Sequence, residues 1–328
     1  MQHQRLGRSP IVVSKICMGT MTFGSQADEK TSFRILDRSL EAGINFFDTA
    51  ENYPVPPQES WAGLTEEIFG RWMKTKRRDE IILATKVCGP SHGWIKGSQR
   101  AGMTALDRHN ITRAIEDSLR RLGTDYIDLY QSHQDDRSVP LEETLGTYAD
   151  LVKAGKVRHI GASNYTAARL AEALDLSRRH RLPAYVSLQP EYNLCKRAGY
   201  EAELEPLCRK RNVGVIGFYS LASGFLSGKY RTEADTTRGA RGSRVAAYLN
   251  ARGLRILAAL DEVAARHHAN PTRVAIAWLI ARPGITAPIA SATSLDQLHD
   301  LVEATRLTLH QDDIALLDRA SGGEATPA

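Results

Sequence analysis

The feature that most constrains this chain is a repeated alternation of short apolar runs with longer segments of helical period. Such runs, rich in Val, Ile, Leu and Phe, recur eight times along the 328 residues, over 13–20, 44–50, 81–87, 126–133, 157–164, 185–190, 213–220 and 285–291. Strand, helix and strand repeated in this way indicate parallel strands joined by right-handed crossovers. The pattern predicts an α/β fold, a (β/α)8 TIM barrel of roughly 250 residues with additions. An open doubly wound sheet is the alternative.

The segments between the runs carry helix start and stop signals. Asn110 is placed to cap a helix that Gly123 ends, and Pro271 stands at a first helical position after Asn270. Further helices are expected over 140–153 and about 166–180. The predicted barrel also has a short N-terminal β-hairpin and extra helices near the C-terminus. Because no linker divides the chain, we expect a single domain over 1–328 with its last few residues disordered.

Composition limits the classes of protein to which the chain can belong. With 42% hydrophobic residues the core can be large, yet no run approaches the roughly 20 apolar residues of a membrane helix. The N-terminus lacks the apolar region of a secretory signal, and the four cysteines have no C-x-x-C spacing. We therefore expect a cytoplasmic protein with no membrane partner. The net charge of +5 is dispersed, which argues against a nucleic-acid partner.

Polar residues stand where three consecutive apolar runs end. Asp48 ends the second run and Tyr53 follows it in the next loop, Lys86 lies near the end of the third, and His133 ends the fourth. Each alone has an ordinary explanation, such as turn chemistry for the aspartate or a structural hydrogen bond for the histidine. Because barrel sites form at the carboxyl ends of strands, we expect the four side chains to converge.

The chemistry of these four groups is coherent. A phenol has a pKa of about 10, and a neighbouring ammonium favours its ionised form and lowers that value. A carboxylate beside the ammonium keeps it charged and fixed, and an imidazole adds a second hydrogen-bonding group. The set suits a step in which negative charge appears on a carbonyl oxygen and is then protonated. We therefore predict general acid catalysis by Tyr53 with Lys86, Asp48 and His133.

A site for an anionic cofactor is expected in the loops after the last two runs. The usual dinucleotide motif G-x-G-x-x-G is absent. G-F-L-S-G-K resembles a P-loop, but it has three residues between its glycines and is followed by Tyr230, which excludes nucleoside triphosphate binding of that kind. Arg238 and Arg244 supply charge, and Thr293 is placed to cap a helix whose N-terminus attracts anions. The adjacent His267 and His268 point about 100° apart on a helix and indicate no metal site.

Five motifs in this order resemble the aldo-keto reductase superfamily: G-I-N-F-F-D-T-A-E-N-Y, A-T-K-V, D-L-Y-Q-S-H, I-G-A-S-N and F-Y-S-L-A-S-G-F-L-S-G-K. The likeness runs from about residue 4 to about residue 310. It is strongest to the bacterial branch related to potassium channel β subunits, and A-E-N-Y-P-V-P-P is similar to the Tas-like reductases. The resemblance implies NADPH-dependent reduction of an aldehyde or ketone to an alcohol, with Asp48, Tyr53, Lys86 and His133 in the catalytic positions.

The resemblance also implies contacts with NADPH. Ser163, Asn164 and Gln189 match residues that bind the nicotinamide amide, and Tyr219 matches the aromatic residue stacked on its ring. The remaining predicted cofactor contacts are Gly19, Thr20, Met21, Ser220, Leu221, Ser223, Gly224, Lys229, Arg238, Arg244, Thr293, Gln297 and Asp300. The chain departs from the family in having Tyr-Ser-Leu for Tyr-Ser-Pro-Leu, Asp300-Leu301 for Glu-Asn, and Ser291 for Gly.

Two other functions remain open at this point. One is an NADP(H)-binding regulatory or redox-sensing protein of the channel β-subunit type with little turnover. Those relatives often have Asn where this chain has His133, which favours an enzyme. The weaker alternative is an unrelated barrel lyase. The partner we expect is a small carbonyl substrate, contacted by His92 and Trp94 in the long loop 88–109 and by Tyr192.

Overall fold

Eight parallel strands form the centre of the computed structural model, which describes residues 1–89, 105–237 and 242–322. The order in the sheet is β10-β3-β4-β5-β6-β7-β8-β9, which follows the chain except at the closing strand. The ring closes where Thr286 N donates to Val215 O and Ile289 N donates to Gly217 O, each at 2.8 Å. The TIM barrel predicted from the sequence is therefore confirmed. The strands are β3 Cys17–Gly19, β4 Phe46–Asp48, β5 Ile82–Val87, β6 Ile127–Ser132, β7 Val157–Ser163, β8 Ser187–Gln189, β9 Gly214–Val215 and β10 Ile289–Ala290.

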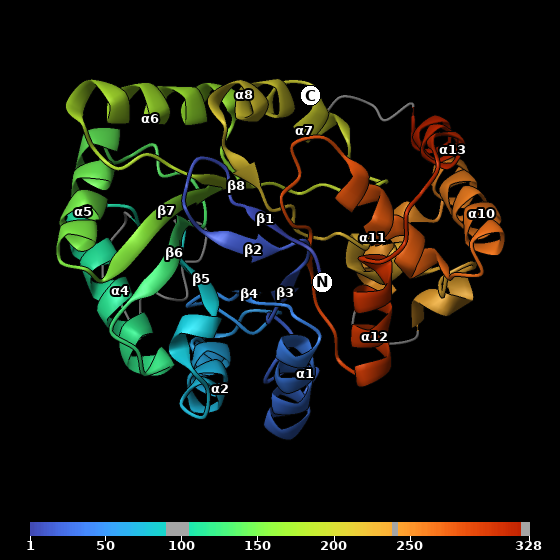
Figure 1. Cartoon of the computed structure of the whole chain (residues 1–328), viewed down its shortest axis with the longest axis horizontal. Coiled ribbons are helices and arrows are strands. Elements are labelled where there is room, and N and C mark those ends of the chain that lie inside the picture. The colour runs from blue at the N-terminus through green and yellow to red at the C-terminus, as the bar shows by residue number, and fades with distance from the viewer. Residues whose placement is uncertain (90–104, 238–241, 323–328) are drawn as a thin grey trace.

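Helices surround this ring, as Figure 1 shows. Their apolar faces pack against the outer faces of the strands, and together they bury the main hydrophobic core. The surrounding helices are α1 Glu29–Glu41, α2 Leu64–Met73, α4 Arg108–Leu122, α5 Leu141–Lys153, α6 Ala167–His180, α8 Leu204–Arg211, α11 Pro271–Ala281 and α12 Leu295–Ala304. The additions are α7 Ala198–Glu201, α9 Gly242–Val245, α10 Ala251–Arg266 and α13 Gln311–Ser321, and α10 packs against α13. Within the described ranges no helix is both long and apolar enough to cross a membrane.

The N-terminal hairpin closes one end of the barrel. Strands β1 His3–Arg5 and β2 Val12–Ser14 pair antiparallel and lie across the middle of the ring in Figure 1. Leu6, Ile11 and Val13 form one buried cluster with residues near the strand starts, among them Phe46 and Val186. Apolar side chains therefore fill this end of the barrel, and the carboxyl ends of the strands are the end at which we look for a site.

The predicted helix boundaries are mostly confirmed, with one correction. Gly123 ends α4 with a φ of +64°, and Asn270 caps α11 immediately before Pro271. Asn110, however, is not the cap of α4. The helix begins two residues earlier, and the carboxylate of Asp107 caps it by accepting a hydrogen bond from Asn110 N. Asp and Asn are nearly equal as caps, so the sequence alone did not separate them.

Candidate active site

Three of the four predicted catalytic side chains touch one another at the carboxyl end of the barrel. Lys86 Nζ lies 2.7 Å from Asp48 Oδ2, 2.7 Å from the carbonyl oxygen of Thr49 and 3.3 Å from Tyr53 Oη. The ring of His133 meets the ring of Tyr53 edge-on, with 6.0 Å between centroids. Asp48, Tyr53 and His133 line one cavity, while Lys86 is fully buried behind them. The strand ends therefore converge as the sequence predicted.

The charges in this cluster are coupled. Burial acts to lower the pKa of Lys86, but Asp48 and Tyr53 outweigh it and hold the pKa of this ammonium above its usual value. Burial raises the pKa of Tyr53, and the neighbouring Lys86 only partly offsets that rise. Lys86 thus acts in the predicted direction, but burial outweighs it and the pKa of Tyr53 stays above its ordinary value. The phenol stays protonated through neutral pH, beside a cation that can stabilise its ionised form.

Gln131 belongs to this cluster, although it was not among the residues predicted from the sequence to lie in the site. Its Nε2 donates to Asp48 Oδ1 at 3.2 Å, and Gln189 Nε2 donates to the same oxygen at 2.9 Å. Gln189 Nε2 also donates to Gln131 Oε1 at 3.2 Å. Both hydrogens of the Gln189 amide are thus in use, and only its oxygen remains to contact a ligand. Gly161 on the neighbouring strand β7 is in register with Gln131. A Cβ at this position would lie 3.0 Å from Gln131 Cγ, so glycine leaves room for the Gln131 side chain.

Ser163 ends strand β7 beside this cluster, and Asn164 follows it. The hydroxyl of Ser163 donates to the carbonyl oxygen of Gln189 at 2.9 Å. Asn164 adopts a φ of +57°, which asparagine tolerates better than most residues, and its Nδ2 donates to the carbonyl oxygen of His133 at 3.0 Å. Strands β6, β7 and β8 are therefore tied together at the cavity wall.

The loop after β9 forms a second part of the cavity. Tyr219, Ala222 and Ser223 have φ values between +47° and +58°, and Gly224 has a φ of +100°. These values form tight turns, in which Ala222 N donates to Tyr219 O at 2.7 Å and Gly224 N donates to Leu221 O at 2.8 Å. The Ser220 hydroxyl donates to Ile289 O at 2.7 Å, which fixes the start of the loop to β10.

The N-terminus of α12 also borders the cavity. Ser294, not Thr293, caps this helix by accepting a hydrogen bond from Gln297 N, which corrects the sequence prediction. Thr293 instead donates to Gln297 Oε1 through both its backbone N–H and its hydroxyl, at 2.8 and 3.1 Å. Asp300 accepts a hydrogen bond from Arg273 Nε at 2.8 Å. A helix N-terminus favours negative charge, so this edge suits a phosphate.

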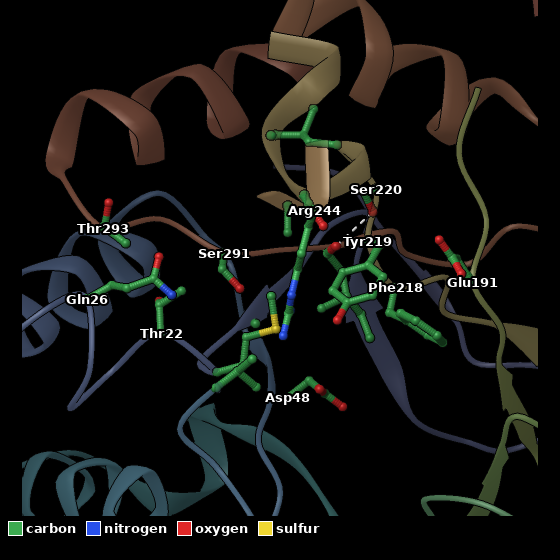
Figure 2. Close-up of a pocket in the computed structure, with 18 of the residues that line it drawn as sticks. Thr22, Gln26, Asp48, Glu191, Phe218, Tyr219, Ser220, Arg244, Ser291 and Thr293 are labelled. Atoms are coloured by element: carbon green, nitrogen blue, oxygen red, sulfur yellow. Dashed lines mark hydrogen bonds between the residues drawn. The ribbon is translucent and has the colours of Figure 1, made fainter. Parts of the chain in front are cut away.

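The whole cavity has a volume of about 890 Å³, at the upper end of the range for small-molecule and cofactor sites. Among the described residues, the cations Lys229 and Arg244 line it. Figure 2 shows the Arg244 side chain directed into the cavity, between Ser291 and Tyr219 in that view. The cavity thus combines a floor of titratable groups at the strand ends with a polar, cationic region in the following loops.

Residues 15–321 match the family model described as the aldo/keto reductase family. The chain belongs to the aldo/keto reductase family. It is 37% identical to protein Tas of Escherichia coli (strain K12), over 97% of each chain. It is 32% identical to a probable voltage-gated potassium channel subunit beta of Oryza sativa subsp. japonica, over 93% of this chain and 91% of the relative. It is 30% identical to L-glyceraldehyde 3-phosphate reductase of Escherichia coli (strain K12), over 97% and 92%. The chain is thus an oxidoreductase of the Tas-like branch that the motifs indicated.

Most residues predicted to contact the cofactor in this member of the aldo/keto reductase family line the cavity: Gly19, Met21, Ser163, Asn164, Gln189, Tyr219, Ser220, Leu221, Ser223, Gly224, Lys229, Arg244, Thr293, Gln297 and Asp300. Their contacts with a cofactor stay predictions. Thr20 does not line the cavity; it is fully buried, and its hydroxyl donates to Asp48 O at 3.0 Å. Arg238, His92 and Trp94 lie outside the residues that the structure describes.

Tyr192, predicted to contact the substrate, lies in the core instead. Its side chain is fully buried, its hydroxyl donates to Glu201 Oε1 at 2.7 Å, and its ring packs against Tyr200 and Trp278. An aromatic residue just after a strand can face either the cavity or the surrounding helices, and here the carboxylate on α7 decides the direction. No group of three or more potential ligands among the described residues is placed to bind a metal ion.

Proposed function

We propose that the protein reduces an aldehyde or ketone to an alcohol with NADPH as the hydride donor. The observation that carries this proposal is the position of Lys86 Nζ, in contact with both Asp48 Oδ2 and Tyr53 Oη at the floor of a large cavity. This arrangement keeps a buried cation beside a phenol that is protonated at neutral pH. Membership of the aldo/keto reductase family supports the same chemistry.

The cavity fits a nicotinamide dinucleotide. Gln189 offers an acceptor to a carboxamide N–H₂ group at one end, and the loop around Ser223, together with Lys229, lines the space for a pyrophosphate farther along. Arg244 and the N-terminus of α12 supply positive potential suited to a 2′-phosphate, which favours NADPH over NADH. When bound, the cofactor supplies the hydride.

The side chains of the protein then supply the proton and stabilise the negative charge that develops. Tyr53 holds a proton at Oη and donates it to the substrate oxygen as negative charge develops there, an effect worth on the order of 10²–10⁴ in rate. Lys86 stabilises the phenolate that remains, and Asp48 holds Lys86 in place. His133 lines the cavity beside Tyr53 and offers a hydrogen bond to the same substrate oxygen. Solvent then returns a proton to Tyr53.

A substrate screen tests the proposal directly. The purified protein is mixed with NADPH and a panel of short aldehydes and ketones, and the loss of NADPH absorbance is followed. We expect saturable oxidation of NADPH with at least one carbonyl class and formation of the matching alcohol. Binding of NADPH with no oxidation by any member of the panel contradicts the proposal.

A second candidate is a redox-sensing protein that binds NADP(H) with little turnover. The observation in its favour is the 32% identity to the rice protein, whose name describes a potassium channel subunit. This candidate predicts tight NADPH binding, negligible turnover with every carbonyl tested, and copurification with a membrane partner. Turnover at about 1 s⁻¹ or faster, within the ordinary range for enzymes, excludes it.

A further inference from the structure

Asn52 is a buried amide on the wall of the cavity that the chemistry described above does not use. It directly precedes Tyr53, lines the same cavity, and is only 3% exposed. Its Oδ1 has no hydrogen-bond partner among the residues that the structure describes. A buried amide oxygen without a partner lowers the stability of the folded protein. We therefore infer that a ligand bound beside the proposed proton donor supplies the missing hydrogen bond.

Other polar groups of the same loop already have partners or do not face the cavity. Glu51, the preceding residue, accepts a hydrogen bond from Cys88 N at 2.5 Å. Thr49 also has an unpartnered buried oxygen, but it does not line the cavity. Asn52 thus combines three properties within this loop: deep burial, an unused acceptor and a position on the cavity wall.

We propose that Asn52 binds a hydroxyl group of the substrate, so that the preferred substrates are short hydroxyaldehydes or hydroxyketones. This inference rests on the proposed function, because it places the reacting carbonyl at Tyr53. A hydroxyl both donates and accepts, so it satisfies whichever end of the amide faces the ligand. Because Asn52 and Tyr53 line the same cavity, we place the hydroxyl on a carbon close to the carbonyl.

The hydroxyl that Asn52 binds has two possible sources within the same cavity, the substrate and a ribose of the cofactor. The substrate assignment is favoured because Asn52 shares its loop with the proton donor, and the loop that we assign to the phosphates lies after another strand. The two sources are separated by measuring NADPH binding and substrate preference on the same variant.

The experiment compares matched carbonyl pairs: propanal with 2-hydroxypropanal, and butanal with 3-hydroxybutanal. Values of kcat/KM with NADPH are measured for the wild type, for Asn52→Leu and for Val55→Ala, a change of cavity shape in the same loop. In the wild type we expect a preference of at least about tenfold for one hydroxylated partner. Asn52→Leu should remove most of this preference, leave the Kd for NADPH within about twofold and leave Tm unchanged or higher, since the orphan amide is gone. Val55→Ala should change both members of a pair alike.

The outcomes separate this inference from the proposed function. Reduction of all four carbonyls with no hydroxyl preference in the wild type overturns the role of Asn52, whatever the variant does, and leaves the reductase intact. A preference that survives Asn52→Leu overturns it as well, as does a weakened Kd for NADPH with the preference unchanged, which assigns Asn52 to the cofactor. Failure to reduce any carbonyl while NADPH binds overturns both proposals.

Discussion

The two ends of the cavity are built in different ways. At the floor, strand residues satisfy one another: both oxygens of Asp48 accept hydrogen bonds, from Lys86 on one side and from Gln131 and Gln189 on the other. At the far end, the walls come from a loop of positive-φ residues, from α9 and from the start of α12. There the cations Lys229 and Arg244 line a space suited to an anion.

This difference indicates whether each end of the cavity controls the rate or the cofactor affinity. Groups that hold one another in place before a ligand arrives cost no reorganisation during the reaction, so the floor should set the rate. Groups whose partners come with the ligand contribute to binding, so the far end should set cofactor affinity. Substitutions at the floor should therefore change kcat, and substitutions at the far end should change Kd.

Lys86→Met should have the largest effect. It leaves the carboxylate of Asp48 buried without its cation, and breaking a buried pair in this way costs about 3–5 kcal/mol of unfolding free energy. The rate should fall by about 100-fold or more, because the phenolate of Tyr53 loses its stabilising charge. Urea denaturation and steady-state kinetics measure the two effects. Lys74→Met, at an exposed position, is the control. Wild-type stability in Lys86→Met contradicts the ion pair.

Gln131→Leu should reduce kcat by about tenfold with a smaller change in the Kd for NADPH. It removes one donor to Asp48 and the acceptor for the second hydrogen of Gln189, with an expected loss of about 1–3 kcal/mol in unfolding free energy. Leu129→Met, a buried change on the same strand outside the amide network, is the matched control. A weaker Kd for NADPH with an unchanged kcat would assign Gln131 to cofactor affinity and contradict this prediction.

Arg244→Gln should act on affinity alone. Removing this cation should raise the Kd for NADPH by about fivefold, close to 1 kcal/mol, while the Kd for NADH changes by less than about twofold. The effect should shrink as salt is added, because an exposed charge is screened. Fluorescence titration with both cofactors at two ionic strengths measures it. An equal change for both cofactors assigns Arg244 to a part of the cofactor that they share.

The smallest effect should be that of pH between neutrality and mild alkali. Because burial raises the pKa of Tyr53, the proton donor stays loaded, and kcat/KM for reduction should vary by less than about twofold from pH 7 to pH 9. The folded state also binds this proton more tightly than the unfolded state, so its contribution to stability is complete below about pH 10 and falls as pH rises further. A loss of reductive activity with an apparent pKa near 8, absent from the cofactor and substrate, contradicts the raised value.

The sequence predicted the barrel and the meeting of Asp48, Tyr53 and Lys86 because both follow from strand order. Parallel strands bring their carboxyl ends together, and a polar residue at such an end has few other places to lie. Gln131 was within reach of the same reasoning. It stands two residues before His133 on one strand, and in register with Lys86 on the next. The prediction did not include Gln131, because a single polar residue inside an apolar run does not by itself indicate a chemical role.

Other features depended on contacts that no local pattern contains. The direction in which the pKa of Tyr53 shifts depends on the balance between burial, which raises it, and the charge of Lys86, which lowers it. The depth of burial is known only from the folded chain. Tyr192 faces the helices because Glu201 accepts its hydroxyl hydrogen. The oxygen of Asn52 is buried on the cavity wall without a partner among the described residues, which is a property of the folded chain alone.

The most direct test of the account is a single-turnover measurement on Tyr53→Phe, loaded with NADPH and mixed with the best carbonyl substrate. We expect the variant to bind NADPH with a Kd within about threefold of the wild type, and the rate of NADPH oxidation to fall by about 100-fold to 10,000-fold. The ring remains and only the hydroxyl group that carries the proton is removed. A single-turnover rate close to that of the wild type would show that another group supplies the proton, and the central role given to the contact between Lys86 and Tyr53 would then be wrong.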